Sequence, residues 1–245
     1  MENPKEPTAK SERLKAKDQP PTAKNLCIIP ARGGSKRIPR KNIKDFLGKP
    51  IIAYSIEVAL KSGLFDEVMV STDDEEIAKV AEQYGAKVPF FRSKEKASDY
   101  ATLADVIEEV IKSYKVQAQK FDYLCCILPT APLMQIEHLH SAYEKLTHSD
   151  FDSIRPIVRF SYPIQRALKL NVRGEVSFFY PEYTKVRSQD LAEGYHDVGQ
   201  FYWMKFSKGL VTSKRGAIVV SPNYVQDIDN EEDWELAEFK YKYFL

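Results

Sequence analysis

The sequence predicts an α/β fold with a mainly parallel, doubly wound sheet. Short, continuously apolar segments alternate with amphipathic segments of helical length along most of the chain. Such alternation places helices on both faces of a parallel sheet, and the apolar runs are too continuous for strands with one face in water. The chain has 245 residues, 43% of them hydrophobic. It is therefore long enough for one Rossmann-like domain with a small appended lobe.

The first predicted strand, residues 26–30, is followed by a polar loop and a predicted helix over residues 51–62. Pro50 stands at the start of this helix and Gly63 just past its end, the positions at which proline and glycine are common. The next predicted elements are a strand at 67–71, a helix at 74–84 stopped by Gly85, and a strand at 87–91.

The alternation of strands and helices continues with a helix at 101–116, a strand at 123–128 and a helix at 135–148. It breaks at residues 152–194, which are rich in Arg, Tyr, Pro and Gln, and we predict a small β-rich excursion there. The segment is dense in donors that suit a ligand with a carboxylate and hydroxyls. An exposed lobe or a dimer contact is the alternative, and a site at a subunit interface would combine the two.

Charge and composition exclude several classes of protein. Thirty-six basic residues balance thirty-five acidic ones, so a general nucleic-acid binder is not expected. No apolar run is long enough to span a membrane, and no signal-peptide pattern opens the sequence. The three cysteines lie inside apolar runs, as core thiols of a reducing compartment do. We expect a soluble, cytoplasmic protein.

The first 24 residues are rich in Lys, Glu, Pro, Ala and Thr and nearly lack large apolar side chains. Such a segment cannot bury enough surface to offset the entropy of ordering. We predict a disordered arm at 1–24 and one folded domain at 25–245.

The loop after the first strand is the strongest functional signal. From Arg32 to Lys44 it holds six Lys or Arg and no acid. The paired Gly33 and Gly34 let backbone N–H groups approach a ligand closely. The loop fits neither the P-loop pattern nor the dinucleotide Gly-x-Gly-x-x-Gly pattern. It predicts a polyphosphate site, and a solvated or nucleic-acid-contacting basic loop is the alternative.

A pair of aspartates, Asp227 and Asp229, suggests a metal. In an extended strand, positions two apart project to the same side. Two carboxylates together with substrate phosphates suit Mg²⁺ better than Zn²⁺. Alternatively, Asp229 is only the N-cap of the helix that follows it.

Other catalytic patterns are absent or weak. The sequence has no Gly-x-Ser-x-Gly elbow. His138, His140 and His148 lack metal-ligand spacing and are expected to be solvated. His196 lies in the segment 195–200, which directly precedes the apolar segment 201–203, and stays a candidate for contact with substrate.

The run Ile-Pro-Ala-Arg-Gly-Gly-Ser-Lys-Arg-Ile-Pro-Arg-Lys-Asn at 29–42 resembles the signature of the sugar-acid cytidylyltransferases, the group that includes the CMP-sialic acid synthetases. Further matches extend the resemblance from about residue 25 to 240. They are Leu-Gly-Lys-Pro-Ile at 47–51, Val-Ser-Thr-Asp at 70–73, Ala-Ser-Asp at 97–99, Pro-Thr-Ala-Pro-Leu at 129–133, Arg-Ser-Gln at 187–189 and Asp-Ile-Asp at 227–229.

The resemblance implies a homodimeric, Mg²⁺-dependent enzyme that transfers CMP from CTP to the anomeric hydroxyl of a nonulosonic acid. It implies that Arg32, Lys41 and Asp229 are catalytic and that Asp227 and Asp229 hold the metal. Asp229 or a metal-bound hydroxide is the candidate proton acceptor. The implied CTP-binding residues are Ala31, Arg32, Gly33, Gly34, Ser35, Lys41, Asn42, Arg92 and Thr102. The candidate sugar-binding residues are Leu128, Thr130, Gln165, Arg166, Arg187, Gln189, His196 and Gln200.

Two departures concern the sugar. Leu128 stands where the sialic acid enzymes usually carry a Gln, and residues 195–203 differ from their usual Asn-Gly-Ala-Ile-Tyr. Residues 161–169 and 195–203 are most similar to the family members that act on pseudaminic acid. The apolar wall formed by Leu128 suits a deoxy position of the sugar. N-acetylneuraminic, legionaminic and Kdo-type acids are the alternatives, and a non-catalytic nucleotide-binding protein is the alternative of another class.

Overall fold

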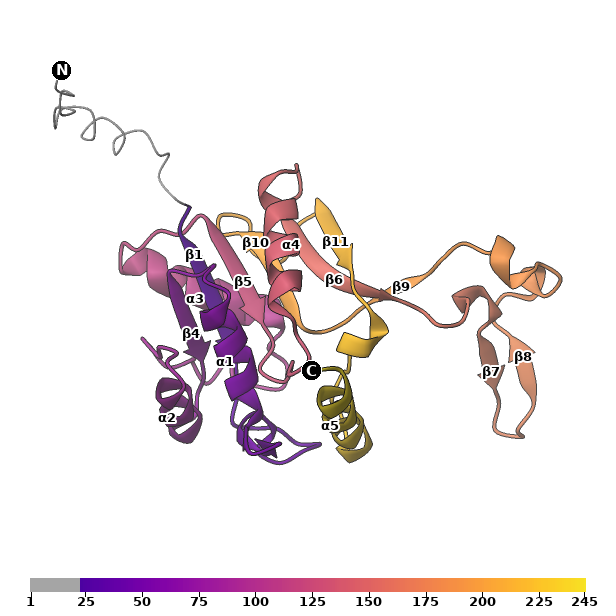
Figure 1. Ribbon diagram of the computed structural model, residues 1–245, viewed down its shortest axis with the longest axis horizontal. Helices are drawn as coiled ribbons and strands as arrows, with labels where there is room; N and C mark the ends of the chain where they lie inside the picture. The colour runs from indigo at the N-terminus through magenta and orange to yellow at the C-terminus, as the bar shows by residue number, and fades with distance from the viewer. Residues whose placement is uncertain (1–22) are drawn as a thin grey trace, which may run out of the picture.

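The computed structural model describes residues 23–245 (Figure 1). The disordered arm predicted for residues 1–24 therefore lies outside the described residues, except for Ala23 and Lys24. The remainder forms one seven-stranded sheet with helices on both faces, and a narrow arm projects from it (Figure 1).

The central sheet has the strand order β11-β6-β10-β5-β1-β4, and β9 pairs with β6. Strand β10 is antiparallel to both its neighbours, β5 and β6, whereas the pairs β1–β4, β1–β5 and β6–β11 are parallel. The strands are β1 (Asn25–Pro30), β4 (Glu67–Ser71), β5 (Tyr123–Ile127), β6 (Ser153–Arg159), β9 (Tyr195–Asp197), β10 (Phe201–Lys205) and β11 (Arg215–Val219). The predicted mainly parallel sheet is confirmed.

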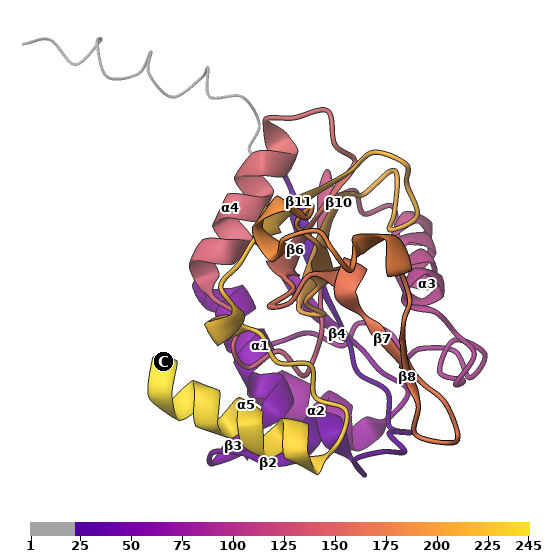
Figure 2. The ribbon, with the colours of Figure 1, turned by 90° about the vertical axis from the view of Figure 1, so that its right-hand side faces the viewer.

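Helices cover both faces of this sheet. The helices are α1 (Ile51–Lys61), α2 (Glu75–Gln83), α3 (Leu103–Val116), α4 (Ile136–Thr147) and α5 (Glu231–Phe244). Helices α1, α2 and α4 share one core with the sheet, and α3 packs on the opposite face. Figure 2 shows α1 and α4 on one side of the sheet and α3 on the other. The doubly wound arrangement follows from the apolar runs of the strands, which are buried on both faces.

Local capping fixes where the helices begin. The side chain of Asp74 accepts hydrogen bonds from the first turn of α2. Thr102 with Asp105 and Asn230 with Asp233 form capping boxes at α3 and α5. Each cap satisfies N–H groups that have no partner within the helix. The predicted helices therefore agree with the structure to within one or two residues at each end.

The strand predicted at residues 87–91 is wrong. Only an isolated bridge between Met69 and Lys87 forms there. Pro89 lies in the middle of the segment. Because proline has no N–H to donate, it cannot continue the ladder on β4.

The predicted excursion begins later than residue 152. Residues 153–159 form β6 inside the central sheet, where Ile154, Pro156 and Val158 are buried at alternate positions of the strand. The part that leaves the sheet is residues 160–194, called the protruding arm below (Figure 1). It holds the hairpin β7 (Leu168–Leu170) and β8 (Val176–Phe178) and three single 3₁₀ turns. Large apolar side chains are exposed along it, among them Tyr162, Leu170 and Val172.

A small aromatic cluster fastens α5 to the rest of the domain. Phe46 lies in the two-stranded ribbon of β2 (Asp45–Phe46) and β3 (Lys49–Pro50). It is fully buried and contacts Tyr54, Trp234 and Tyr241 edge to face. Such ring pairs add to the stabilisation from burial alone. The cluster therefore joins the N-terminal ribbon to the C-terminal helix.

We expect Phe46→Ala to lower the free energy of unfolding by about 3–5 kcal/mol, as phenylalanine deletions in cores do. Phe239→Ala is the matched control, because Phe239 lies on the outer side of α5 and is 60% exposed. The control should change stability by no more than about 0.5 kcal/mol. Urea unfolding followed by circular dichroism measures both, and equal losses would contradict the cluster's role.

Candidate functional site

The basic loop borders a cavity at the carboxyl ends of β1 and β5, the place where open sheets of this type bind ligands. The cavity measures about 750 Å³. Predicted site residues from three separate segments line it. These are Arg32, Ser35, Lys41 and Asn42 from the loop, Arg92 and Thr102 from the segment before α3, and Leu128 and Thr130 after β5.

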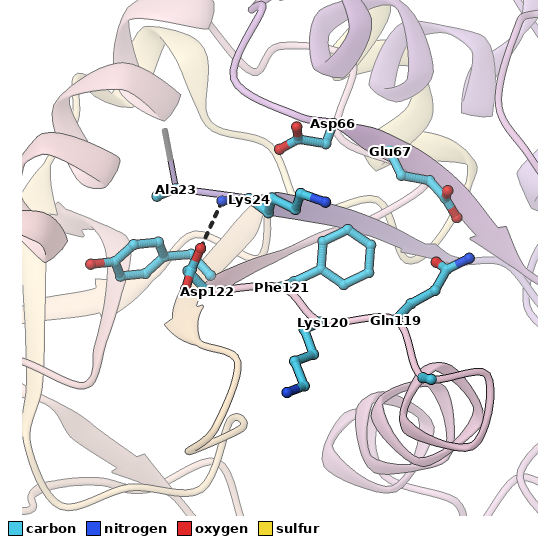
Figure 3. Close-up of a pocket in the computed structure, with 10 residues that line it drawn as sticks. Ala23, Lys24, Asp66, Glu67, Gln119, Lys120, Phe121 and Asp122 are labelled. Carbon is cyan, nitrogen blue, oxygen red and sulfur yellow. Dashed lines mark hydrogen bonds between the residues drawn. The ribbon is translucent and has the colours of Figure 1, made fainter. Parts of the chain in front are cut away.

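A larger cavity of about 890 Å³ lies at the opposite, amino-terminal ends of the strands (Figure 3). Its polar groups serve to hold the start of β1. The Lys24 N–H donates to Asp122 (2.8 Å) and the Asn25 N–H donates to Asp66 (2.7 Å). Because these carboxylates already accept backbone hydrogen bonds, we place the functional site at the basic loop.

The Asp99 carboxylate lines this cavity and pairs with two cations of the basic loop. Arg32 donates to Asp99 at 2.8 Å, and Lys36 also pairs with Asp99. The side chain of Asn42 donates to the Arg32 carbonyl (2.9 Å) and so closes the loop upon itself. No role was predicted for Asp99 from the sequence. Its position in the matching Ala-Ser-Asp motif at 97–99 was the available signal.

Lys41 connects the basic loop to the C-terminal segment. It lies in a short 3₁₀ turn (η1, Lys41–Ile43), and its ammonium group donates to the Ile228 carbonyl at 2.6 Å. Burial is the main cause that lowers the pKa of Lys41, and the charge of Asp229 opposes it. The carbonyl that Lys41 binds belongs to the residue between the two predicted metal ligands.

Asp227 and Asp229 are not in a strand, contrary to the expected geometry. They lie between the 3₁₀ turn η5 (Pro222–Tyr224) and α5. The N-cap of α5 is Asn230, so the alternative that made Asp229 the cap is wrong. The Asp229 carboxylate instead pairs with Arg37 at 2.6 Å.

A metal at these aspartates would need ligands from outside the chain. Within residues 23–245 no group of three or more His, Cys, Asp or Glu side chains is arranged to hold a metal. Two carboxylates beside a polyphosphate cavity nevertheless suit Mg²⁺, which takes one or two carboxylates and completes its shell with water and phosphate oxygens. The donor set fits magnesium, provided that a phosphate ligand is bound.

Arg92 and Thr102 lie at the far wall of the cavity. Arg92 is buried, and its guanidinium donates to the Ser71 carbonyl (2.5 Å) and hydroxyl (3.1 Å) at the end of β4. The Thr102 hydroxyl caps α3 and donates to Asp105 at 2.6 Å. Both side chains therefore already have hydrogen-bond partners within the chain.

The candidate sugar residues are divided between two places. Leu128 and Thr130 line the cavity, whereas Gln165, Arg166, Arg187 and Gln189 lie on the protruding arm, away from it (Figure 1). Three of the arm residues have partners within the arm itself. Gln165 donates to Ala192, Arg166 donates to Val186, and Arg187 pairs with Asp190. One chain does not bring these side chains to its own cavity.

His196 and Gln200 also differ from their expected positions. His196 lies on β9, where its ring packs against Phe160 outside the cavity lining. Gln200 is 2% exposed, and its side-chain amide donates to the Tyr224 carbonyl at 2.5 Å. A buried amide in this position supports the segment leading to Asp227 and does not face a ligand freely.

His140 and His148 are exposed, as expected, whereas His138 is partly buried. His140 contacts the Ser62 carbonyl at 3.0 Å, and His148 contacts the Glu144 carbonyl at 2.9 Å. Burial lowers the pKa of His138. His138 and His140 lie on α4 and His148 is its C-cap residue, and none of the three lines the cavity described above.

The sequence of this chain is similar to those of several known proteins. The profile of the family described as "Cytidylyltransferase" matches residues 26–205. The pseudaminic acid cytidylyltransferase of Campylobacter jejuni subsp. jejuni serotype O:2 is 49% identical over 226 residues, which cover 89% of this chain and 97% of that protein. N-acylneuraminate cytidylyltransferase A of Danio rerio is 36% identical over 216 residues, which cover 86% of this chain and 49% of that protein.

Solved structures share the fold. A CMP:2-keto-3-deoxy-manno-octonic acid synthetase complexed with CTP superposes with a TM-score of 0.65 over 91% of this chain and 100% of its own. A 4-diphosphocytidyl-2C-methyl-D-erythritol synthase from Anaerococcus prevotii superposes with a TM-score of 0.59 over 90% and 99%. Their sequence identities, 17% and 14%, limit these two likenesses to the fold.

Proposed function

The chain belongs to the cytidylyltransferase family, and on that premise we propose that it transfers CMP from CTP to pseudaminic acid and releases pyrophosphate. The observation that carries the choice of sugar is the 49% identity to the Campylobacter jejuni enzyme over nearly the full length of both chains. The cavity beside the basic loop is where the reaction takes place.

In this reaction the anomeric hydroxyl of the sugar acid attacks the α-phosphorus of CTP. The bond from the α-phosphorus to the bridging oxygen breaks, and pyrophosphate departs with that oxygen. The enzyme's contribution to such a displacement is positioning and the stabilisation of negative charge. Arg32, Lys36 and Lys41 line the cavity and supply three positive charges there.

Asp227 and Asp229 are the residues that would hold magnesium, with phosphate oxygens and water completing its shell. When bound, the ion supplies positive charge that stabilises the leaving pyrophosphate. Asp229 is the candidate acceptor of the proton that the attacking hydroxyl loses. Its pairing with Arg37 must loosen for either role.

Sugar selection begins at Leu128, whose side chain lines the cavity. An apolar wall accepts a deoxy or methyl position of the sugar without leaving a polar group unpaired, and it penalises a hydroxyl at the same place. This supports pseudaminic acid over N-acetylneuraminic acid, which carries hydroxyls where pseudaminic acid ends in a methyl group. Legionaminic and Kdo-type acids remain the alternatives that share the chemistry.

We further infer a homodimer in which the protruding arm of one subunit supplies sugar contacts to the cavity of its partner. The arm exposes apolar side chains that a subunit contact would bury. Its donors, such as Arg166 and Arg187, do not reach the cavity of their own chain. A shared site gives both features one explanation.

The setting we propose is the cytoplasm. Cys27, Cys125 and Cys126 are all free and buried, as expected in a reducing compartment. No helix among residues 23–245 has the length and apolar character needed to cross a bilayer.

We expect the purified protein to release pyrophosphate from CTP only when pseudaminic acid and Mg²⁺ are both present. A coupled pyrophosphate assay with each nonulosonic acid in turn measures this, with ATP and UTP as nucleotide controls. Turnover of N-acetylneuraminic acid equal to or above that of pseudaminic acid would contradict the choice of sugar. Binding of CTP without turnover on any sugar acid would favour the non-catalytic alternative.

Asp229→Asn should weaken the response to magnesium as well as lower turnover. The amide keeps the size of the side chain but loses the charge that attracts a cation. We expect the Mg²⁺ concentration for half-maximal rate to rise by about tenfold, measured by titration at saturating CTP. Glu231→Gln, on the same segment but paired with Lys44, is the control. An unchanged titration for Asp229→Asn would place the metal elsewhere.

The shared site predicts complementation between two inactive variants. Lys41→Ala removes a cavity cation, and a double replacement of Arg166 and Arg187 by Ala removes donors of the arm. Coexpression should restore about one quarter of wild-type activity, because half of the dimers are mixed and each mixed dimer holds one complete site. No recovery in a mixture of proven dimers, or a monomeric mass in light scattering, would contradict the proposal.

A further inference from the structure

The residue before Lys41 has a strained backbone. Arg40 has φ 55° and ψ 27°, the left-handed conformation that side chains other than glycine rarely adopt. Such a conformation persists only where the surrounding structure holds it. It matters here because it sets the direction in which the chain enters the turn that carries Lys41.

Two carboxylates hold Arg40 in this conformation. Its guanidinium forms a bidentate pair with Asp74, at 2.5 and 3.0 Å, and a third bond to Glu76 at 2.5 Å. Planar, two-point pairing of this kind fixes orientation as well as distance. The Arg40 guanidinium is the main cause that lowers the pKa of Asp74 to about 2. The pair therefore stays ionised at any pH at which an enzyme would be assayed.

Asp74 also fixes the other end of the basic loop. It accepts hydrogen bonds from the Glu76 and Ile77 N–H groups as the N-cap of α2. Gly33 lies so close that a Cβ there would come within 2.6 Å of an Asp74 oxygen. The Gly33 N–H meanwhile donates to the neighbouring Asp73 at 3.1 Å. Residues 33 and 40 of the loop are thus both positioned against the first residues of one helix.

We propose that Arg40 and Asp74 form a clasp that positions Lys41 and the glycines of the loop for the triphosphate. Neither residue lines the cavity, so both are positioning residues and not substrate contacts. The clasp holds one side of Lys41, and the hydrogen bond to Ile228 holds the other. The expected effect on kcat rests on the proposed function, whereas the ordering of the loop can be measured whether or not the protein has that function.

Asp74→Asn is the most informative variant, because asparagine caps a helix as well as aspartate does but cannot form the ion pair. We expect kcat to fall about 10- to 100-fold, the scale of a displacement of about 1 Å in a catalytic group. The midpoint of thermal unfolding should remain near that of the wild type. Arg40→Leu should produce a similar loss in kcat, and Arg40→Lys a smaller one.

The double variant tests whether the two residues act as a unit. Arg40→Leu combined with Asp74→Asn should be no slower than the worse single variant, because either change alone already opens the clasp. Losses that multiply would mean two independent roles and would overturn the proposal. Lys87→Gln, which breaks an ion pair with Glu67 far from the cavity, is the control and should keep wild-type kinetics.

Limited trypsin digestion gives a readout that is independent of activity. The loop offers cleavage sites after Lys36, Arg37, Arg40 and Lys41, and an intact clasp protects them. We expect Asp74→Asn to be cut in this segment several-fold faster than the wild type and Lys87→Gln. Equal cleavage rates would overturn the clasp even if the wild type proved inactive on every sugar acid. An inactive wild type whose Asp74→Asn variant is still cut faster would refute only the proposed function.

Discussion

The conformation of the basic loop depends on partners from other elements, because its six cations repel one another and the loop carries no acid of its own. Like charges this close are stable only if other parts of the chain supply partners. Five of the six cations pair with carboxylates from elsewhere, and Lys41 binds a backbone carbonyl. The carboxylates are Asp74 and Glu76 at the start of α2, Asp99 before α3, and Asp229 and Glu231 near the start of α5. Exposed pairs of this kind each contribute little to stability, but together they draw three elements onto the loop and so build the cavity.

These pairs divide by the side of the loop on which they lie. Asp99 lines the cavity and holds Arg32 and Lys36 there, so a bound triphosphate competes for the same two cations. Asp74 lies behind the loop and is bound to the backbone of α2 as well as to Arg40. The first arrangement can exchange one anion for another, whereas the second resists displacement. The loop can therefore keep its shape while the charges on its cavity side change partners.

The sequence was sufficient wherever short-range chemistry decided the structure. Pro50, Gly63 and Gly85 marked the helix ends, the apolar runs identified most of the strands, and the charge of the loop predicted a polyphosphate ligand. Prediction failed where a tertiary choice intervened. Gln200 was a candidate sugar contact, but its burial and its bond to Tyr224 depend on how the residues before β10 meet the η5 turn. Segment 153–159 resembled the start of an excursion, and only sheet pairing showed that it is β6.

The proposed function divides the cavity into a phosphate half and a sugar half, and these differ in how completely one chain builds them. The phosphate half is finished within the chain, with each cation of the loop held by a partner. The sugar half has only Leu128 and Thr130 from the core, while the donors best suited to a carboxylate and hydroxyls lie on the protruding arm. In the proposed dimer the arm can change its side chains without disturbing the ion pairs that hold the loop. A common phosphate machinery can then serve different sugar acids, because the sugar contacts proposed for the arm lie on an element that contributes no strand to the central sheet, and only Leu128 and Thr130 come from the core.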